Sequence, residues 1–277
     1  MAPTGWLDVH GHFFMPDQLE PANWERFMRA FVKSDNFLVP EGYRWTLDDT
    51  LQDMDRNGVQ MQILSYLPLD IPKLRQANDY AASIVKGNPT RFGYFAALPT
   101  EDPRACLDEI DRVLKEGADV QPDGFAVTAC RKGIYFSDPS LLPVWEKLES
   151  LGAVVFMHPM AYGAPKDGRP LPVIEVAFET ARVATDMVYR KLPIKFPNVK
   201  VILAHSGGAL PALSGRLQLL GTEPWVPNEE GVTAEEMGRQ LASFYVDTAA
   251  TAETGLQPAV KMCGPEHVIY GADCGVP

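Results

Sequence analysis

Histidines gather at the ends of apolar runs in this chain of 277 residues. Four of the five histidines hold such positions, and a further apolar run ends in an aspartate; the residues are His10, His12, His158, His205 and Asp273. Imidazole and carboxylate are the groups that hold first-row divalent cations in catalytic sites. Histidines scattered at random have no reason to share this placement. The pattern therefore predicts one metal ion, bound where several strand ends meet.

Each of these residues also has a structural interpretation when it is taken alone. In a strand, His10 and His12 point to the same side because they are two residues apart, but such a pair also occurs as two solvated polar residues. His158 and His205 are compatible with buried, hydrogen-bonded histidines. Asp273 is compatible with a turn residue after a strand. Only the joint pattern predicts a metal site.

Two further candidates are set aside, and the ligand chemistry narrows the choice of metal. Asp247 also ends an apolar run, but we interpret it as a structural residue. His267 precedes its run, which places it at the opposite end of a strand. Zinc is the expected ion, with manganese as the alternative because a carboxylate is present. Thiolate ligation is not expected, although Cys274 adjoins Asp273.

Strand and helix patterns alternate along the chain. The predicted strands are residues 6–14, 60–67, 91–98, 123–129, 153–158, 200–205, 244–249 and 267–273. Most are almost continuously apolar, which is typical of parallel strands covered on both faces. The predicted helices are residues 47–57, 73–87, 103–116, 140–151, 173–192, 209–220, 233–242 and 253–263. The first has the clearest ends, with Thr46 as N-cap, Asp49 three residues on and Gly58 as terminator.

This alternation predicts an α/β fold, a (β/α)8 TIM barrel of the metal-dependent hydrolase type, with its active site at the C-terminal ends of the strands. Residues 1–277 show no linker or repeat, so we expect a single domain with a loop excursion at about residues 15–45. The chain stops just after the eighth strand. The last helix of the barrel is therefore expected to be missing from it.

Composition argues against several classes of partner. The net charge of −11, without a basic stripe to offset it, argues against nucleic acid. No apolar run approaches the roughly 18 residues that span a membrane. The four cysteines show no CxxC spacing, and the N-terminus does not read as a signal peptide. A cytoplasmic protein with reduced thiols is the expectation.

Several motifs together carry a family resemblance. They are Asp8-Val-His-Gly-His12, Met157-His-Pro159, the segment from Ile202 to Pro211 with Gly215-Arg216, Phe244-Tyr-Val-Asp247, and the segment from Val268 to Asp273. With them the chain resembles the amidohydrolase superfamily, in the amidohydrolase-related branch that contains the aminocarboxymuconate-semialdehyde, γ-resorcylate and 6-methylsalicylate decarboxylases. The resemblance covers nearly the whole chain. Within this branch, the chain resembles the 6-methylsalicylate decarboxylases most.

The resemblance implies roles for the candidate residues. It implies a mononuclear metal, usually zinc, on the residues His10, His12, His158 and Asp273. It also implies that His205 lies beside the metal and handles water or substrate, and that Asp273 can protonate carbon. The arginine matching Arg216 reaches across a dimer interface to bind the substrate carboxylate, which implies a homodimer. A guanidinium suits this role because its planar fork matches a carboxylate.

The loop before the second strand departs from the family pattern. A second carboxylate-binding arginine is expected a few residues before the tryptophan that matches Trp45, but Glu41 stands about there and Arg44 is out of register. A dicarboxylate semialdehyde is therefore not expected as substrate. A monocarboxylated aromatic ring, such as a salicylate, fits the aromatic-rich loop better. Trp45, Arg44 and Arg216 are the expected substrate-binding residues.

These features predict a metal-dependent, non-oxidative decarboxylase of a carboxylated aromatic, a hydroxybenzoate such as 6-methylsalicylate. Asp273 or a bound water would protonate the ring carbon that bears the carboxylate, after which the C–C bond breaks and CO2 leaves. The same ligands would serve a hydrolase of a lactone, ester or amide. A barrel without its last helix is also compatible with a binding protein that has no turnover. The sequence alone does not choose between hydrolysis and lyase chemistry.

Overall fold

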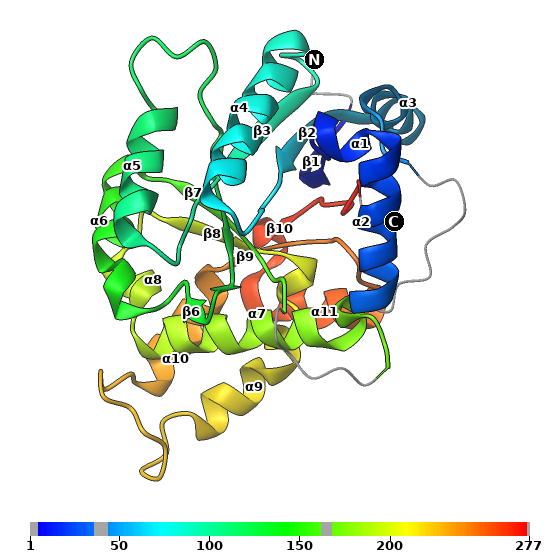
Figure 1. Cartoon of the computed structure of the whole chain (residues 1–277). Coiled ribbons are helices and arrows are strands. Elements are labelled where there is room, and N and C mark those ends of the chain that lie inside the picture. The colour runs from blue at the N-terminus through cyan, green and yellow to red at the C-terminus, as the bar shows by residue number, and fades with distance from the viewer. Residues whose placement is uncertain (1–4, 36–43, 162–167, 276–277) are drawn as a thin grey trace.

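Eight parallel strands form one sheet at the centre of the protein, as a computed structural model shows (Figure 1). The structure describes residues 5–35, 44–161 and 168–275. In order across the sheet, the strands are Trp6–His12 (β1), Val59–Ser65 (β2), Phe92–Ala97 (β3), Gly124–Thr128 (β4), Val154–His158 (β7), Lys200–Leu203 (β8), Tyr245–Asp247 (β9) and Val268–Ile269 (β10).

Backbone hydrogen bonds join the first strand to the segment that follows the last one. The amide of Val9 donates to the carbonyl of Tyr270 at 3.0 Å, and the amide of His12 donates to the carbonyl of Cys274 at 2.7 Å. The sheet is thereby nearly closed on itself. The predicted (β/α)8 barrel is confirmed, and the ends of β1 and β10 are neighbours as the prediction requires.

Alternate residues of each strand face two separate apolar cores. One core fills the barrel and takes residues from every strand: Val9, Ile63, Phe95, Ala97, Ala126, Phe156, Ile202, Ala204, Tyr245 and Ile269. The other lies between the sheet and the helices and takes the residues in between, among them Leu64, Val127, Met157 and Val246. This period of two fixes which side chains at the strand ends can point into the mouth of the barrel.

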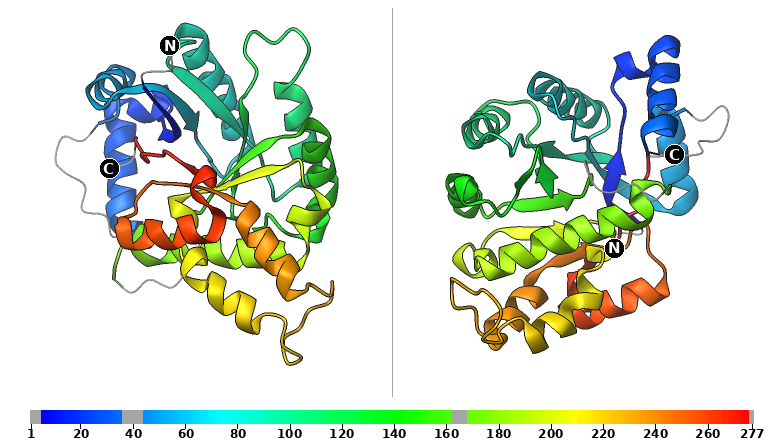
Figure 2. Two further views of the ribbon diagram at one scale, coloured as in Figure 1. Left: turned by 180° about the vertical axis from the view of Figure 1, so that it is seen from behind. Right: turned by 60° about the horizontal axis from the view of Figure 1, so that its bottom comes forward.

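Helices surround the sheet (Figures 1 and 2). They are Pro16–Leu19 (α1), Pro21–Asp35 (α2), Leu47–Asn57 (α3), Ile71–Gly87 (α4), Pro103–Val113 (α5), Leu142–Leu151 (α6), Leu171–Tyr189 (α7), Leu192–Lys195 (α8), Leu210–Leu220 (α9), Ala234–Ser243 (α10) and Glu253–Cys263 (α11). The α3 helix has the expected ends, since Thr46 accepts a hydrogen bond from the Asp49 amide and Gly58 is left-handed. Among the described residues, none of the helices has the length and hydropathy needed to cross a bilayer.

The segment predicted as a loop excursion at residues 15–45 is largely helical where it is described. It forms α1 and α2, and the ring of Trp24 on α2 packs at 5.1 Å from that of Phe14. An amphipathic helix can direct aromatic side chains such as Trp24 toward the rest of the protein, and this packing favours a helix over the loop that we expected. A short hairpin, Cys130–Arg131 (β5) with Ile134–Tyr135 (β6), was also not predicted.

The turn after β8 brings the backbone unusually close to α7. Residues His205, Ser206, Gly207 and Gly208 all have positive φ, between 55° and 75°. A Cβ atom on Gly208 would lie 2.4 Å from the carbonyl oxygen of Ala177. Only glycine fits there, because both the conformation and the space exclude a side chain.

We predict that Gly208→Ala lowers the free energy of unfolding by roughly 2 kcal/mol or more, as measured by urea denaturation. Gly87→Ala is the matched control, because Gly87 ends α4 with nothing within 4 Å of an added Cβ atom. That control should leave stability unchanged or raise it slightly. Equal stability of the two variants would contradict the close approach of this turn to α7.

Candidate metal centre

The barrel presents imidazoles and carboxylates at the mouth from strands that are far apart in the sequence. His158 ends β7 two residues after the interior Phe156, and Asp247 ends β9 two residues after the interior Tyr245. His10 and His12 come from β1, while His205 and Asp273 follow β8 and β10. All of these positions therefore open on the same end of the barrel.

Four of the side chains form a group that can hold a metal ion. One ligand atom from each of His10, His158, His205 and Asp273 lies within 4.8 Å of the other three. His12 stands against the same group, with its Nε2 atom 3.1 Å from Nε2 of His10 and 3.2 Å from Oδ1 of Asp273. The structure thus brings together all five residues that the sequence singled out.

Unpaired nitrogen atoms in this group fit a cation. Neither ring nitrogen of His158 has a hydrogen-bond partner among the described residues, although both are buried, and the same holds for Nδ1 of His205. Buried polar atoms are nearly always paired, so each exception needs an explanation. A lone pair directed at a shared metal ion explains one nitrogen of each ring, because imidazole nitrogen is a ligand for zinc and manganese.

The electrostatics keep His158 and Asp273 in the protonation states that metal ligands need. Burial, followed by the neighbouring imidazoles, lowers the pKa of His158 well below its usual value, so the ring is neutral. Burial alone would raise the pKa of Asp273, but hydrogen bonds from His10, His12 and His205 hold it far below its usual range. A neutral imidazole and an ionised carboxylate are the forms that coordinate metals.

Asp247, which we interpreted as a structural residue, orients one of the candidate ligands. Its Oδ2 atom lies 2.7 Å from Nδ1 of His10, and both side chains are fully buried. Burial alone would lower the pKa of His10, but the carboxylates of Asp247 and Asp273 outweigh it and raise that pKa to about 10. This point of the site therefore attracts positive charge. The register of Asp247 with the interior Tyr245 was the available signal, since it turns the carboxylate toward the mouth.

Asp247 also anchors the strained turn that carries His205. Its Oδ1 atom accepts from the amide of Ser206 at 3.3 Å, and its carbonyl accepts from the Ser206 hydroxyl at 2.9 Å. His205 and Asp273 both adopt left-handed φ values, 56° and 57°, which cost energy in residues other than glycine. Strain of this kind persists only where surrounding contacts fix the backbone, and here Asp247 supplies two of them for the Ser206 turn.

Asp8 ties the two chain ends of the site together. Its Oδ1 atom accepts hydrogen bonds from the amides of His10, at 2.9 Å, and Ala272, at 3.0 Å. Its Oδ2 atom accepts from Nε2 of Gln62 on β2 at 2.8 Å. The carboxylate is fully buried. One side chain thus sets the spacing between the His10 segment and the Asp273 segment.

The residues expected to bind substrate are split between two places. Trp45 and Arg44 line a cavity of about 350 Å³ that also reaches Asp273. Trp45 is buried, and its indole nitrogen has no partner among the described residues. Arg44 is exposed and donates to the carbonyl of Leu19 at 2.5 Å. Glu41, on which the substrate argument partly rested, lies outside the described residues.

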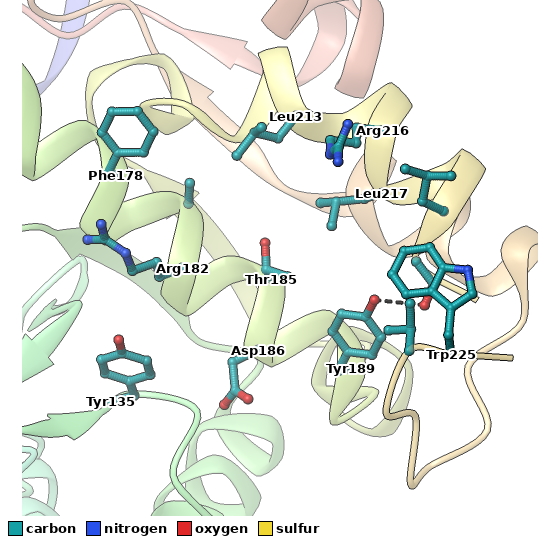
Figure 3. A pocket seen from close by; sticks show the side chains of 14 residues that line it. Tyr135, Phe178, Arg182, Thr185, Asp186, Tyr189, Leu213, Arg216, Leu217 and Trp225 are labelled. Carbon is teal, nitrogen blue, oxygen red and sulfur yellow. Dashed lines mark hydrogen bonds between the residues drawn. The ribbon is translucent and has the colours of Figure 1, made fainter. Parts of the chain in front are cut away.

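Arg216 lies apart from the mouth, in a groove between α7 and α9 (Figure 3). The groove measures about 620 Å³, and Phe178 and Arg182 of α7 face Leu213 and Arg216 of α9 across it. Arg216 forms no salt bridge within the part of the chain that the structure describes. Arg216 lies outside the cluster of imidazoles and carboxylates within its own chain.

Neither His267 nor Cys274 belongs to the group of four residues described above. His267 turns away, with Nδ1 at 2.9 Å from the carbonyl oxygen of Ala242. Burial raises the pKa of the Cys274 thiol to about 11. Without a bound metal ion, the thiol is therefore protonated at neutral pH.

Comparison with known proteins identifies the family. The amidohydrolase family matches residues 7–277, so the chain belongs to it. A decarboxylase of Penicillium terrestre, macB, is 31% identical over 96% of this chain and 83% of its own length. The 6-methylsalicylic acid decarboxylase of Penicillium expansum is 31% identical over 96% of this chain and 84% of its own length. The resemblance drawn from the sequence motifs is confirmed.

Solved structures agree on the fold. A dihydroxybenzoic acid decarboxylase from Polaromonas, determined with bound manganese and the inhibitor 2-nitroresorcinol, superposes with a TM-score of 0.76. The match covers 98% of this chain and 86% of that one at 24% sequence identity. The likeness supports the barrel architecture independently of the strand register.

We predict that Asp247→Ala weakens metal binding by about 10- to 100-fold, because His10 loses the partner that fixes its ring. Asp247→Asn should lose less, since an amide oxygen can still accept from Nδ1. Competition with a chelator measures the affinity, and urea denaturation of the metal-free variants separates this effect from loss of the Ser206 turn. Equal metal affinity of the wild type, Asp247→Ala and Asp247→Asn would show that Asp247 does not support the metal site.

Proposed function

We propose that this protein decarboxylates ortho-hydroxylated benzoates without oxidation, with 6-methylsalicylate as the representative substrate. The curated relatives named above make the chain a carboxy-lyase of the amidohydrolase superfamily. The observation that carries the proposal is the cluster of His10, His158, His205 and Asp273 within 4.8 Å. No organic cofactor is needed, because the ring and its hydroxyl hold the electrons during the reaction.

The ligands in this proposal are His10, His12, His158 and Asp273, with zinc as the ion and manganese as the alternative. The donor set of imidazoles and one carboxylate supports either ion, and the structural neighbour from Polaromonas holds manganese. A divalent ion there would act as a Lewis acid on the carboxylate and the ring hydroxyl of the substrate. The cavity lined by Trp45 and Asp273 offers an aromatic wall beside the cluster.

His205 and Asp273 are the residues that we propose to move the proton. Asp273 directs Oδ1 at His10 and His12, at 3.3 and 3.2 Å, and Oδ2 at Nε2 of His205, at 3.3 Å. The two oxygens can therefore serve different tasks. A proton shared between His205 and Oδ2 is delivered to the ring carbon that bears the carboxylate. The bond to the carboxylate then breaks, its electron pair restores the aromatic ring, and CO2 leaves.

The first test joins metal content to turnover. We predict about one ion per chain in the purified protein and release of CO2 from 6-methylsalicylate. His158→Ala should lose both the bound ion and the CO2 release, because it removes a buried imidazole that we assign as a metal ligand. His267→Ala is the matched control and should keep both, since His267 contacts the Ala242 carbonyl and the Tyr245 ring and is not part of the cluster.

Two results would count against this function. One is a metal-free preparation that decarboxylates at the full rate. The other is proton release from a lactone or ester with no CO2 formed from any hydroxybenzoate, which is the outcome expected of a hydrolase with the same ligands. Product analysis distinguishes these results from simple loss of folding, which circular dichroism reports.

We further propose that the protein is a homodimer in which the face around the Arg216 groove contacts a second copy. Large apolar side chains that line this groove are exposed, with Phe178 at 43% and Trp225 at 69%. Exposed apolar surface of this kind commonly marks a protein interface. In a dimer, Arg216 would reach the mouth of the partner and bind the substrate carboxylate.

A cytoplasmic location also stays a proposal, in keeping with the free thiols of all four cysteines.

The dimer is tested by complementation between two inactive variants. Arg216→Ala removes the proposed contribution to the partner, and His158→Ala removes the metal site. Co-expressed with different tags and isolated as a mixed dimer, they should recover about half of the wild-type activity, because one complete site remains. A monomer in sedimentation, or a mixed dimer as inactive as its parents, would contradict the shared site.

A further inference from the structure

Two strands end at the mouth of the barrel in hydroxyl side chains. Ser65 is the last residue of β2 and Thr128 the last of β4. Ile63 and Ala126, two residues earlier, belong to the core inside the barrel. Because side chains two apart in a strand share a face, Ser65 and Thr128 also point inward, at the level where the metal cluster lies.

The strand pairing places each hydroxyl residue beside a histidine of the cluster. Ser65 pairs with His12 across β1 and β2, and Thr128 pairs with His158 across β4 and β7. Contacts reinforce both pairings. Nδ1 of His12 lies 3.1 Å from the carbonyl oxygen of Ser65, and the amide of Ala129 donates to the carbonyl of His158 at 3.0 Å.

Both hydroxyls are buried and lack a partner among the described residues. Ser65 is 1% exposed and Thr128 fully buried, yet neither oxygen makes a hydrogen bond. The hydroxyl of Thr100 is likewise buried without a partner among the described residues. Other buried hydroxyls are paired: that of Thr180 donates to the Val176 carbonyl and that of Ser206 to the Asp247 carbonyl. An unpaired buried hydroxyl costs stability, so an apolar residue would serve packing better at both positions.

We infer that Ser65 and Thr128 form a substrate subsite that binds the oxygen atoms of the aromatic acid on either side of the metal cluster. Each hydroxyl can donate to a carboxylate oxygen or pair with the ring hydroxyl ortho to it. This inference rests on the proposed function for the class of ligand. It adds the residues that distinguish an ortho-hydroxylated benzoate from an unsubstituted one.

The apolar core below the two hydroxyls supports an aromatic ligand. Phe156 stacks on Phe95 at 5.7 Å, and its ring lies 4.9 Å from that of His10. A benzoate ring entering the mouth therefore meets aromatic side chains below and polar oxygen-binding groups at the rim. Oriented hydrogen bonds in such a place are worth more than in water, because the surroundings are of low polarity.

Binding of salicylate and benzoate to the metal-loaded protein tests the subsite without requiring turnover. The variants are Thr128→Val, which keeps the shape and removes the hydroxyl, and Ser65→Ala. We expect the dissociation constant of salicylate, measured by calorimetry, to rise by at least about tenfold in each variant. In at least one of them, the preference for salicylate over benzoate should also fall. Thr128→Ser, which restores a hydroxyl, should recover most of the affinity.

Thr180→Val is the matched control, because its buried hydroxyl is already bonded within α7. It should lower the melting temperature and leave the binding of both probes unchanged. Thr128→Val should do the reverse, with an unchanged or raised melting temperature and weaker binding. A purely structural Thr128 would instead give a lower melting temperature and wild-type affinities.

The outcomes separate this inference from the proposed function. Wild-type affinity for salicylate in both Thr128→Val and Ser65→Ala overturns the subsite even if the protein releases CO2. Weakened, less selective binding supports the subsite even if no hydroxybenzoate is decarboxylated, in which case only the assigned reaction fails.

Discussion

A single buried carboxylate holds the two ends of the catalytic cluster together. Asp8 accepts hydrogen bonds from the amides of His10 and Ala272, and so joins β1 to the segment that carries Asp273. The barrel can close without this side chain, because backbone bonds from Val9 and His12 also cross the seam. Asp8 adds a side-chain contact to Ala272, directly before Asp273, that those backbone bonds do not provide. Metal coordination needs closely defined ligand positions, which gives a buried carboxylate a reason to be there.

Two carboxylates besides Asp8, those of Asp247 and Asp273, position the imidazoles of the cluster. Asp247 fixes His10, and the same carboxylate holds the turn in which Ser206 follows His205. Asp273 then meets three imidazoles, which keep it ionised despite its burial. His158 contributes no charge, because burial and its imidazole neighbours keep the ring neutral. The carboxylate of Asp273 and the neutral ring of His158 thus belong to the group that can hold a metal ion, while Asp247 acts on that group through His10.

Much of this could be predicted from sequence, because the governing signals were local. The α3 helix begins at Thr46 and ends at Gly58 through capping geometry that four or five residues encode. Ligand-type residues at strand ends were visible in the same way. What the sequence did not reveal depended on contacts between distant segments. Asp247 looked structural because its partner, His10, is 237 residues away, and the helix α2 gains its stability from packing aromatic side chains that local propensity does not reveal. Arg44 stays a predicted substrate-binding residue; it lines the cavity that reaches Asp273 and donates to the Leu19 carbonyl on α1.

The mouth of the barrel divides between two kinds of strand. β1 and β7, with the segments after β8 and β10, supply nitrogen and carboxylate ligands, whereas β2 and β4 end in the neutral hydroxyls of Ser65 and Thr128. A charged residue at either neutral position would compete with Asp273 for the cation or repel the substrate carboxylate. An apolar one would leave the oxygens of a bound aromatic acid without partners on that side. Hydroxyls avoid both penalties, because they add no net charge and can donate to an anion or accept from a phenol. The chemistry of one ring with adjacent acid and hydroxyl groups thus accounts for neutral hydroxyls at the ends of β2 and β4.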